Sequence, residues 1–255
     1  MSGICGVYGK GDIEEMTRVL AHRGPDDSGY FLQGPLQIGV NRLAVFDLAG
    51  GHQPLSDELE KIWIALDGNI YNFPELRREL AELGHSFQTN TDTEVVVHAW
   101  QEWGPACLGR LNGQFAFALW EGGRLHLVRD RMGEKPLYFY HRGGRLLFAS
   151  EIKSLLTQVA PVPRFTDEFR DFEAPVAEDT LFQNIRELPA GCRALFDGHS
   201  LNVMRWWNLE PVEETRRTES DLVDELRELL QDAVRLRMRG DVNVGVFLSG
   251  GLDSA

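Results

Sequence analysis

The first 160 residues form short apolar runs separated by turns, with two stretches of helical spacing between them. The run WIALDGNIYN at 63–72 predicts a strand that ends in a glycine turn. Asn72 and Glu75 then have the spacing of a helix-capping box, and Gly84 is expected to end the helix that follows. The apolar stripe of this helix consists of Leu76, Leu80 and Leu83.

A second helix and two hairpins follow. Thr91 and Glu94 repeat the capping spacing, and Gly104 is expected to end this helix. In NGQFAFALWEGGRLHLVRD at 112–130 and PLYFYHRGGRLLFAS at 136–150, a Gly-Gly pair separates two apolar runs, which is typical of β-hairpins. Strands with two interposed helices favour an α+β layered sandwich.

The pattern changes twice in the second half. Residues 161–217 are rich in proline and lack helical spacing, so we expect a trailing β segment and linker after a first domain at 1–160. From Thr218 helical spacing returns, and VNVGVFL at 242–248 predicts a buried strand before SGGLDSA. A helix, a strand and a glycine-rich turn predict the start of an α/β nucleotide-binding domain at 218–255. The apolar stripe of its helix consists of Leu222, Leu226, Leu229, Leu230 and Ala233.

Composition narrows the classes of function. The net charge of −13 argues against nucleic-acid binding and against binding to an anionic membrane surface. No apolar run approaches the roughly 18–20 residues that a bilayer requires. The three cysteines, Cys5, Cys107 and Cys192, are too widely spaced for a metal site and odd in number for a disulfide framework, which favours the reducing cytoplasm.

The string SGGLDS directly after an apolar strand could hold phosphate groups. Its glycines let backbone N–H groups approach phosphate oxygens, its hydroxyls add donors, and Asp253 could hold Mg²⁺ on a nucleotide. The lysine of the GxxxxGK[ST] loop is missing, and an ordinary turn is the alternative. The candidate ATP-binding residues are Leu248, Ser249, Gly250, Gly251, Asp253 and Ser254.

SGGLDS resembles the pyrophosphatase loop of ATP-dependent ligases that adenylate a carboxylate, and the whole chain resembles the asparagine synthetase family. The supporting strings are HRGPDDSG (22–29), NRLAVFDLAGGHQPL (41–55), DGNIYN (67–72), TNTDTE (89–94), RDRMGEKPLYF (129–139), FASEIKSLL (148–156) and ELPAG (187–191). The resemblance implies an N-terminal class II glutamine amidotransferase domain. That domain is a four-layer αββα sandwich of the N-terminal-nucleophile hydrolase type, which needs no cofactor.

In that family the first domain hydrolyses L-glutamine and passes ammonia to a second domain. The second domain uses ATP and Mg²⁺ to activate aspartate or another carboxylate acceptor. The resemblance also suggests a homodimer. The residues that bind the adenylate and the acceptor would lie beyond Ala255, so we expect this chain by itself to form no amide and to bind ATP weakly.

The resemblance assigns the nucleophile to an N-terminal cysteine that is exposed when the initiator methionine is removed and uses its own α-amino group as base. Laid on the usual opening M-C-G-I-x-G, Gly3, Ile4 and Gly6 match, and Ser2 takes the cysteine position. A shifted register would make Cys5 the nucleophile, but four residues would have to be removed first. In the unshifted register Cys5 is a small buried residue on the first strand.

Two further positions match the family's substrate contacts. Arg42 matches the arginine that pairs with the substrate carboxylate, with a purely structural arginine as the alternative. Asp92 matches the acidic residue that binds the α-amino group, although an acidic residue also suits the first turn of a helix. The implied glutamine-binding set is Arg42, Leu43, Ala44, Val45, Phe46, Asp67, Gly68, Asn69 and Asp92.

The family's string N-G-E-I-Y-N reads D-G-N-I-Y-N here. Asp67 replaces an asparagine that donates to the oxyanion, and a carboxylate cannot donate. Gly68 keeps its backbone N–H, and Asn69 replaces a glutamate that faces the substrate ammonium. Together with Ser2, these departures predict that glutaminase activity is weak or lost.

Three functions remain open for the chain. The first is an asparagine synthetase that draws free ammonia. The second is a ligase of the β-lactam synthetase or lasso-peptide cyclase kind, whose nitrogen comes from an amine on its own substrate. The third is a non-catalytic scaffold domain. The changes at Ser2 and Asp67 favour the second and third for the first domain, whereas RDRMGEKPLY and SGGLDSA favour the first for the whole protein.

Overall fold

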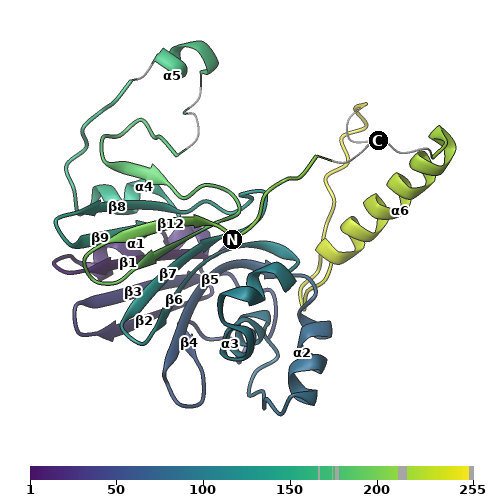
Figure 1. Cartoon of the computed structure of the whole chain (residues 1–255), viewed down its shortest axis with the longest axis horizontal. Helices are drawn as coiled ribbons and strands as arrows, with labels where there is room; N and C mark the ends of the chain where they lie inside the picture. Colours follow the sequence, from purple (N-terminus) through teal and green to yellow (C-terminus); the bar gives the residue numbers. More distant parts are fainter. Residues whose placement is uncertain (166, 174, 176–177, 212–216, 253–255) are drawn as a thin grey trace.

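Two six-stranded antiparallel sheets lie face to face at the centre of the molecule (Figure 1). The computed structural model describes residues 1–165, 167–173, 175, 178–211 and 217–252. The first sheet has the order β10 (Ile185–Glu187), β8 (Tyr138–Arg142), β9 (Arg145–Ala149), β1 (Gly3–Tyr8), β3 (Leu36–Arg42) and β2 (Asp27–Gln33). The second has the order β12 (Leu201–Arg205), β11 (Cys192–Phe196), β7 (Arg124–Arg129), β6 (Gly113–Glu121), β5 (Ile62–Ile70) and β4 (Leu55–Ser56).

Helices cover both outer faces, which gives the expected αββα order of layers. The first sheet packs on α1 (Ile13–Arg18) and α4 (Ile152–Leu156), and the second packs on α2 (Phe73–Glu82) and α3 (Asp92–Trp103). The remaining helical segments are η1 (Ala21–Arg23), η2 (Gly104–Arg110), α5 (Asp167–Phe172) and α6 (Glu219–Arg237).

Strand alternation divides the core into separate apolar layers. On β1, Ile4 points into the layer between the sheets, while Cys5 points to α1 and α4. On β5, Ala65 faces the other sheet, while Leu66 faces α2 and α3. Ser2 and Asp67 therefore stand on the inward-facing positions of the two strands, where the strands emerge from the core.

The helix boundaries agree with the sequence in most respects. Thr91 caps α3 by accepting a hydrogen bond from the backbone N–H of Glu94, and Gly84 and Gly104 follow the ends of α2 and α3 with positive φ. The capping box predicted at Asn72 is wrong. The Asn72 side chain instead donates to the carbonyl of Arg110 and accepts from the backbone N–H of Asn112, because η2 returns to the start of α2.

The segment expected to be a trailing β segment and linker contributes to both sheets. β10 pairs with β8 at the edge of the first sheet, and β11 and β12 extend the second sheet beyond β7. The region also contains the short helix α5. The sandwich therefore continues past residue 160 to Arg205.

Beyond the sandwich, α6 projects from the body of the molecule (Figure 1). The predicted helix is present, begins with a capping box at Thr218 and has none of its residues buried. The strand predicted at 242–248 is not formed, and Phe247 is fully exposed. A strand of an α/β sheet needs neighbours for its N–H and C=O groups, and no described strand pairs with this segment.

Every helix in the described ranges is too short or too polar to span a lipid bilayer.

Candidate active site

A small cavity lies where β1 begins and where β3 and β5 end, beside the start of α3. Its volume is about 20 Å³, which holds roughly one water molecule, so an amino acid could enter only if the lining residues moved. The lining residues are Ser2, Arg42, Leu43, Val45, Phe46, Gln53, Gly68, Asn69, Thr91, Asp92 and Thr93. The fold thus brings together most of the residues implied by the resemblance, and leaves Ala44 and Asp67 out of the described lining.

Ser2 is held by hydrogen bonds to both its side-chain hydroxyl and its backbone carbonyl. Its hydroxyl accepts a hydrogen bond from the backbone N–H of Leu43 at 3.2 Å, and its carbonyl accepts one from Nε of Arg23 at 2.8 Å. The side chain is buried yet borders the cavity. While Met1 precedes it, the nitrogen of Ser2 is an amide and cannot act as a base.

Cys5 lies away from the cavity. It is fully buried on the opposite face of β1, with Sγ 3.4 Å from Oγ1 of Thr17. Burial raises the pKa of the Cys5 thiol to about 12, against weaker opposing hydrogen bonds. A thiol that remains protonated near neutrality is a poor nucleophile, so the structure gives no support to the shifted register.

Arg42 is fixed by the loop that follows it. Its Nη2 donates to the carbonyls of Phe46 at 2.7 Å and Asp47 at 2.8 Å, and its Nη1 donates to Leu48 at 3.4 Å. A Cβ at Gly51 would lie 2.2 Å from Nη2 of Arg42, so a side chain there would displace the guanidinium from this position. The loop thus presents a buried guanidinium to the cavity, which suits a carboxylate ligand.

Asp92 and Asn69 both line the cavity, and the Asn69 amide lies close enough to Asp92 to lower its pKa. Burial raises the pKa of Asp92 to about 6, although hydrogen bonds from Ile70, Thr93 and Asn69 oppose the shift. Oδ2 of Asp92 accepts from the backbone N–H of Ile70 at 2.8 Å, which ties α3 to the end of β5. The amide of Asn69 therefore supports the carboxylate that would receive an ammonium group.

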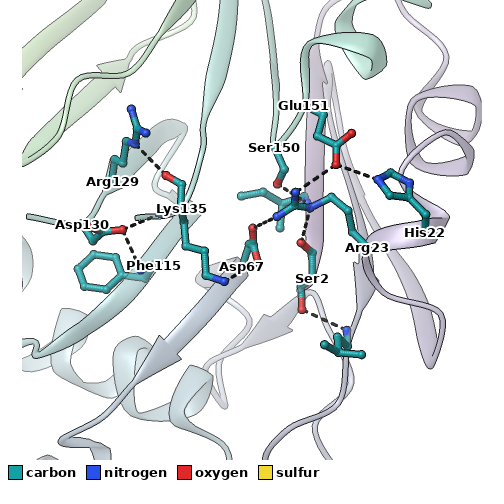
Figure 2. Close-up of polar contacts among 12 residues, drawn as sticks. Ser2, His22, Arg23, Asp67, Phe115, Arg129, Asp130, Lys135, Ser150 and Glu151 are labelled. Atoms are coloured by element: carbon teal, nitrogen blue, oxygen red, sulfur yellow. Dashed lines mark hydrogen bonds and ion pairs between the residues drawn. The ribbon is translucent and has the colours of Figure 1, made fainter. Parts of the chain in front are cut away.

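Asp67 takes part in a buried cluster of charges behind Ser2 (Figure 2). Its Oδ2 accepts from Nη2 of Arg23 at 2.7 Å, and its Oδ1 lies 3.9 Å from Nζ of Lys135. Oδ1 has no hydrogen-bond partner among the described residues. Burial raises the pKa of Asp67, and the two cations offset this shift only in part. The carboxylate is thus directed to Arg23 and Lys135.

Arg23 joins the parts of this cluster. Its three nitrogens donate to the carbonyl of Ser2, to Asp67 and, from Nη1 at 3.1 Å, to Glu151. Burial opposes ionisation of Glu151, but hydrogen bonds from Lys153, His22 and Arg23 lower its pKa to about 2. Figure 2 shows Arg23 between Ser2, Asp67 and Glu151.

Lys135 is placed by a tightly bonded turn. The carboxylate of Asp130 accepts from the backbone N–H groups of Met132, Glu134 and Lys135, and Arg129 donates to the carbonyl of Lys135 at 2.7 Å. Sequence reasoning gave no role to Arg23 or Lys135. Arg23 lies in HRGPDDSG and Lys135 in RDRMGEKPLYF, two of the strings that supported the resemblance. Their place in these strings is the sequence feature that could have pointed to a role in the site.

Gly68 sits where two strands approach closely. Its φ is +139°, and a Cβ would lie 2.0 Å from the carbonyl oxygen of Gln114 on β6. Only glycine fits this position, beside the cavity and between Asp67 and Asn69.

The predicted ATP loop is separate from the cavity. Leu248, Ser249, Gly250 and Gly251 are exposed, and the backbone N–H of Gly251 donates to the Ser249 hydroxyl at 3.4 Å. Asp253 and Ser254 lie outside the described residues. The described part of the loop makes a local turn, and its nucleotide-binding role stays a prediction.

Comparison with known proteins agrees with this architecture. Residues 1–207 match the glutamine amidotransferase domain family, and residues 225–255 match the asparagine synthase family. Asparagine synthetase [glutamine-hydrolyzing] 3 of Bacillus subtilis is 38% identical over 98% of this chain and 42% of its own length. A putative asparagine synthetase [glutamine-hydrolyzing] 2 of Methanocaldococcus jannaschii is 32% identical over 99% of this chain and 56% of its own. The chain thus spans about half the length of these curated relatives.

The fold is also similar to a solved structure of glutamine phosphoribosylpyrophosphate amidotransferase from B. subtilis. The TM-score is 0.60 at 21% identity, over 80% of this chain and 49% of that chain. This likeness confirms the expected sandwich of the N-terminal-nucleophile hydrolase type. With its amidotransferase match over residues 1–207 and its asparagine synthase match after it, the chain belongs to the glutamine amidotransferase domain family in the form found in asparagine synthetases.

Proposed function

We propose that this chain is the amidotransferase part of an ATP-dependent, amide-forming ligase of the asparagine synthetase type, and that its glutaminase activity is weak or lost. The main support for a weak or lost glutaminase activity is that the Asp67 carboxylate contacts Arg23 and Lys135. This contact lies directly behind a serine in the nucleophile position. Glutamine hydrolysis needs a nucleophile, a base and oxyanion donors, and the first and third of these are altered here.

Each alteration has a separate chemical cost. The hydroxyl of Ser2 is far less ionised near neutrality than a thiol. Asp67 cannot donate a hydrogen bond while it is ionised, and loss of one oxyanion donor costs on the order of 10²–10³ in rate. The backbone N–H of Gly68 remains as a donor at this position.

The contacts to an amino acid are better preserved. Arg42 offers a buried guanidinium for a carboxylate, and Asp92, supported by Asn69, offers a carboxylate for an ammonium group. These two groups lie on the same cavity. They support L-glutamine as a ligand that the site still binds, more weakly than an intact site would.

The rest of the ligase is proposed by analogy with the relatives. ATP and Mg²⁺ would bind through the SGGLDS loop, with Asp253 on the metal, and aspartate or another carboxylate would be the acceptor. The three cysteines are unpaired and buried, which supports a cytoplasmic location. The changes at Ser2 and Asp67 also fit a ligase whose nitrogen comes from an amine on its own substrate, or a scaffold domain.

The first test measures glutamate release from L-glutamine by the parent chain, Ser2→Ala and Cys5→Ser, with removal of Met1 checked by intact mass. We expect the parent to release glutamate at less than about one hundredth of the rate of an intact glutaminase. Any residual activity should disappear in Ser2→Ala and persist in Cys5→Ser. Turnover by the parent at the rate of an intact enzyme would contradict the proposal, and loss of turnover in Cys5→Ser would favour the shifted register.

A further inference from the structure

The segment after α6 returns to the amidotransferase site and binds the loop beside it. The backbone N–H of Asp241 donates to the carbonyl of Val45 at 2.8 Å, and Oδ2 of Asp241 accepts from the backbone N–H of Asp47 at 2.7 Å. These two bonds hold one residue of the chain's last segment against residues 45–47. Figure 1 shows this segment passing from the end of α6 to the region above α2.

The loop that Asp241 holds is the one that fixes Arg42. The carbonyls of Phe46 and Asp47 accept from Nη2 of Arg42, while the N–H of Asp47, which lies between them, donates to Asp241. The Asp47 side chain accepts from the backbone N–H groups of Asn90 and Gly50, which lower its pKa. Asp47 has a φ of +46°, a conformation that a non-glycine residue keeps only when its surroundings fix it.

The same segment also contacts the other wall of the site. Nη1 of Arg239 donates to the carbonyl of Tyr71 and lies 3.4 Å from Glu75. Arg237, the last residue of α6, pairs with Glu134 at 3.1 Å and lies over the Tyr71 ring. Tyr71 follows directly after Asn69 and Ile70 at the end of β5, so these arginines connect the segment to the strand that carries Gly68.

We propose that Asp241 is a positioning residue for the amino-acid site. By holding the Asp47 amide, it keeps the 45–48 loop in the conformation whose carbonyls orient Arg42, while Arg239 anchors the segment to the end of β5. This inference rests on the proposed binding of glutamine. It assigns to residues 239–241, which lie within the asparagine synthase match, an influence on the amidotransferase site.

The test compares the full chain with Asp241→Ala, Asp241→Asn and a control, Asp232→Ala. Asp232 is exposed on α6 and pairs with Arg235 within the same helix. One measurement is hydrogen exchange of the amides of residues 45–48, which needs no ligand. The other is the equilibrium affinity for L-glutamine by calorimetry, which does not depend on hydrolysis.

We expect Asp241→Ala to speed exchange of the Asp47 amide about fivefold to tenfold and to weaken glutamine binding by a similar factor. Asp241→Asn keeps an acceptor oxygen and should stay within about twofold of the parent, as should Asp232→Ala. Unchanged exchange in Asp241→Ala would overturn the inference, and so would faster exchange with unchanged affinity. If the parent binds no glutamine at all, the proposed function fails at that point, and the exchange result still decides whether Asp241 holds the loop.

Discussion

At the scale of single residues, the structure gives Asp67 two partners, Arg23 and Lys135, to which the sequence assigned no role. Asp67 replaces an amide donor, and sequence reasoning placed its negative charge at the oxyanion. The structure directs the carboxylate to Arg23 and Lys135, 44 and 68 residues away along the chain. Such pairing depends on which strand face carries the residue and on two remote loops, so it could not be predicted from local spacing.

The Arg23 cluster gives the first prediction. Arg23→Gln leaves Asp67 and Glu151 without their shared buried cation, so we expect the free energy of unfolding to fall by about 3–5 kcal/mol. Asp67→Asn keeps an acceptor for Arg23, which still pairs with Glu151, but leaves the buried Lys135 ammonium without this anion, so we expect a smaller fall of about 1–3 kcal/mol. Urea unfolding of both variants and of the double variant measures the coupling. A double variant as unstable as the sum of the two singles would show that Arg23 and Asp67 do not interact.

Asp92 gives a prediction about pH. Because burial raises its pKa to about 6, the folded state binds more protons than the unfolded state between pH 4 and pH 6. Stability from this group is therefore greatest at low pH, falls as pH rises through that window and is constant above about 6. The loss should be on the order of 3 kcal/mol. Between pH 4.5 and pH 7 the contribution of Asp92 should fall by about 2 kcal/mol, so urea unfolding at these two pH values should show the parent losing about that much more stability than Asp92→Asn. Equal pH dependence in both chains would exclude Asp92 as its source.

At the scale of elements, helices and hairpins were predicted well where the signal was local. The Gly-Gly turns of the two hairpins, the cap at Thr91 and the glycines after α2 and α3 all depend on residues close together in sequence. Asn72 failed as a cap because its side chain bonds to residues 110 and 112, a competitor that is distant in sequence. The Glu94 side chain accepts from the backbone N–H groups of Gln88 and Thr89, which lie just before the cap of α3.

Thr91→Ala tests the importance of the α3 cap. Its hydroxyl accepts from the backbone N–H of Glu94, and losing that bond should lower the free energy of unfolding by about 1 kcal/mol. Thr91→Ser retains the hydroxyl and is the matched control. Denaturant unfolding of the two variants makes the comparison. Equal destabilisation by serine and alanine would attribute the loss to the methyl group of threonine and not to the cap.

At the scale of the whole molecule, the layered sandwich was predictable and its extent was not. The strands β10 to β12 lie in a proline-rich segment, yet they complete the edges of both sheets. Of these strands, β10 and β12 lie at sheet edges and present few buried residues, and all three are only three to five residues long, so the apolar pattern gave little indication of them. The opposite holds for 242–248, where a strongly apolar run forms no strand beside any described neighbour.

This arrangement predicts that the sandwich is stable without α6. Because α6 buries no residue and the segment after it contributes only a few exposed hydrogen bonds and ion pairs, a chain ending at residue 207 should lose no more than about 1–2 kcal/mol in free energy of unfolding. Its 45–48 loop should nevertheless exchange hydrogen faster, since Asp241 is absent. Thermal unfolding and hydrogen exchange of the shortened chain supply both values. A loss of several kcal/mol would mean that α6 and the segment after it are an integral part of the fold.

The proposed weakness of the glutaminase activity depends on Ser2 and Asp67 together. It is tested most directly by measuring kcat/KM for glutamate release in the parent, Ser2→Cys, Asp67→Asn and the double variant, each with Met1 removed. We expect Ser2→Cys and Asp67→Asn each to raise kcat/KM, and the double variant to gain on the order of 10²–10³ over Ser2→Cys, as restored oxyanion donation requires. A double variant no more active than Ser2→Cys, or a parent already as active as the double variant, would contradict the account.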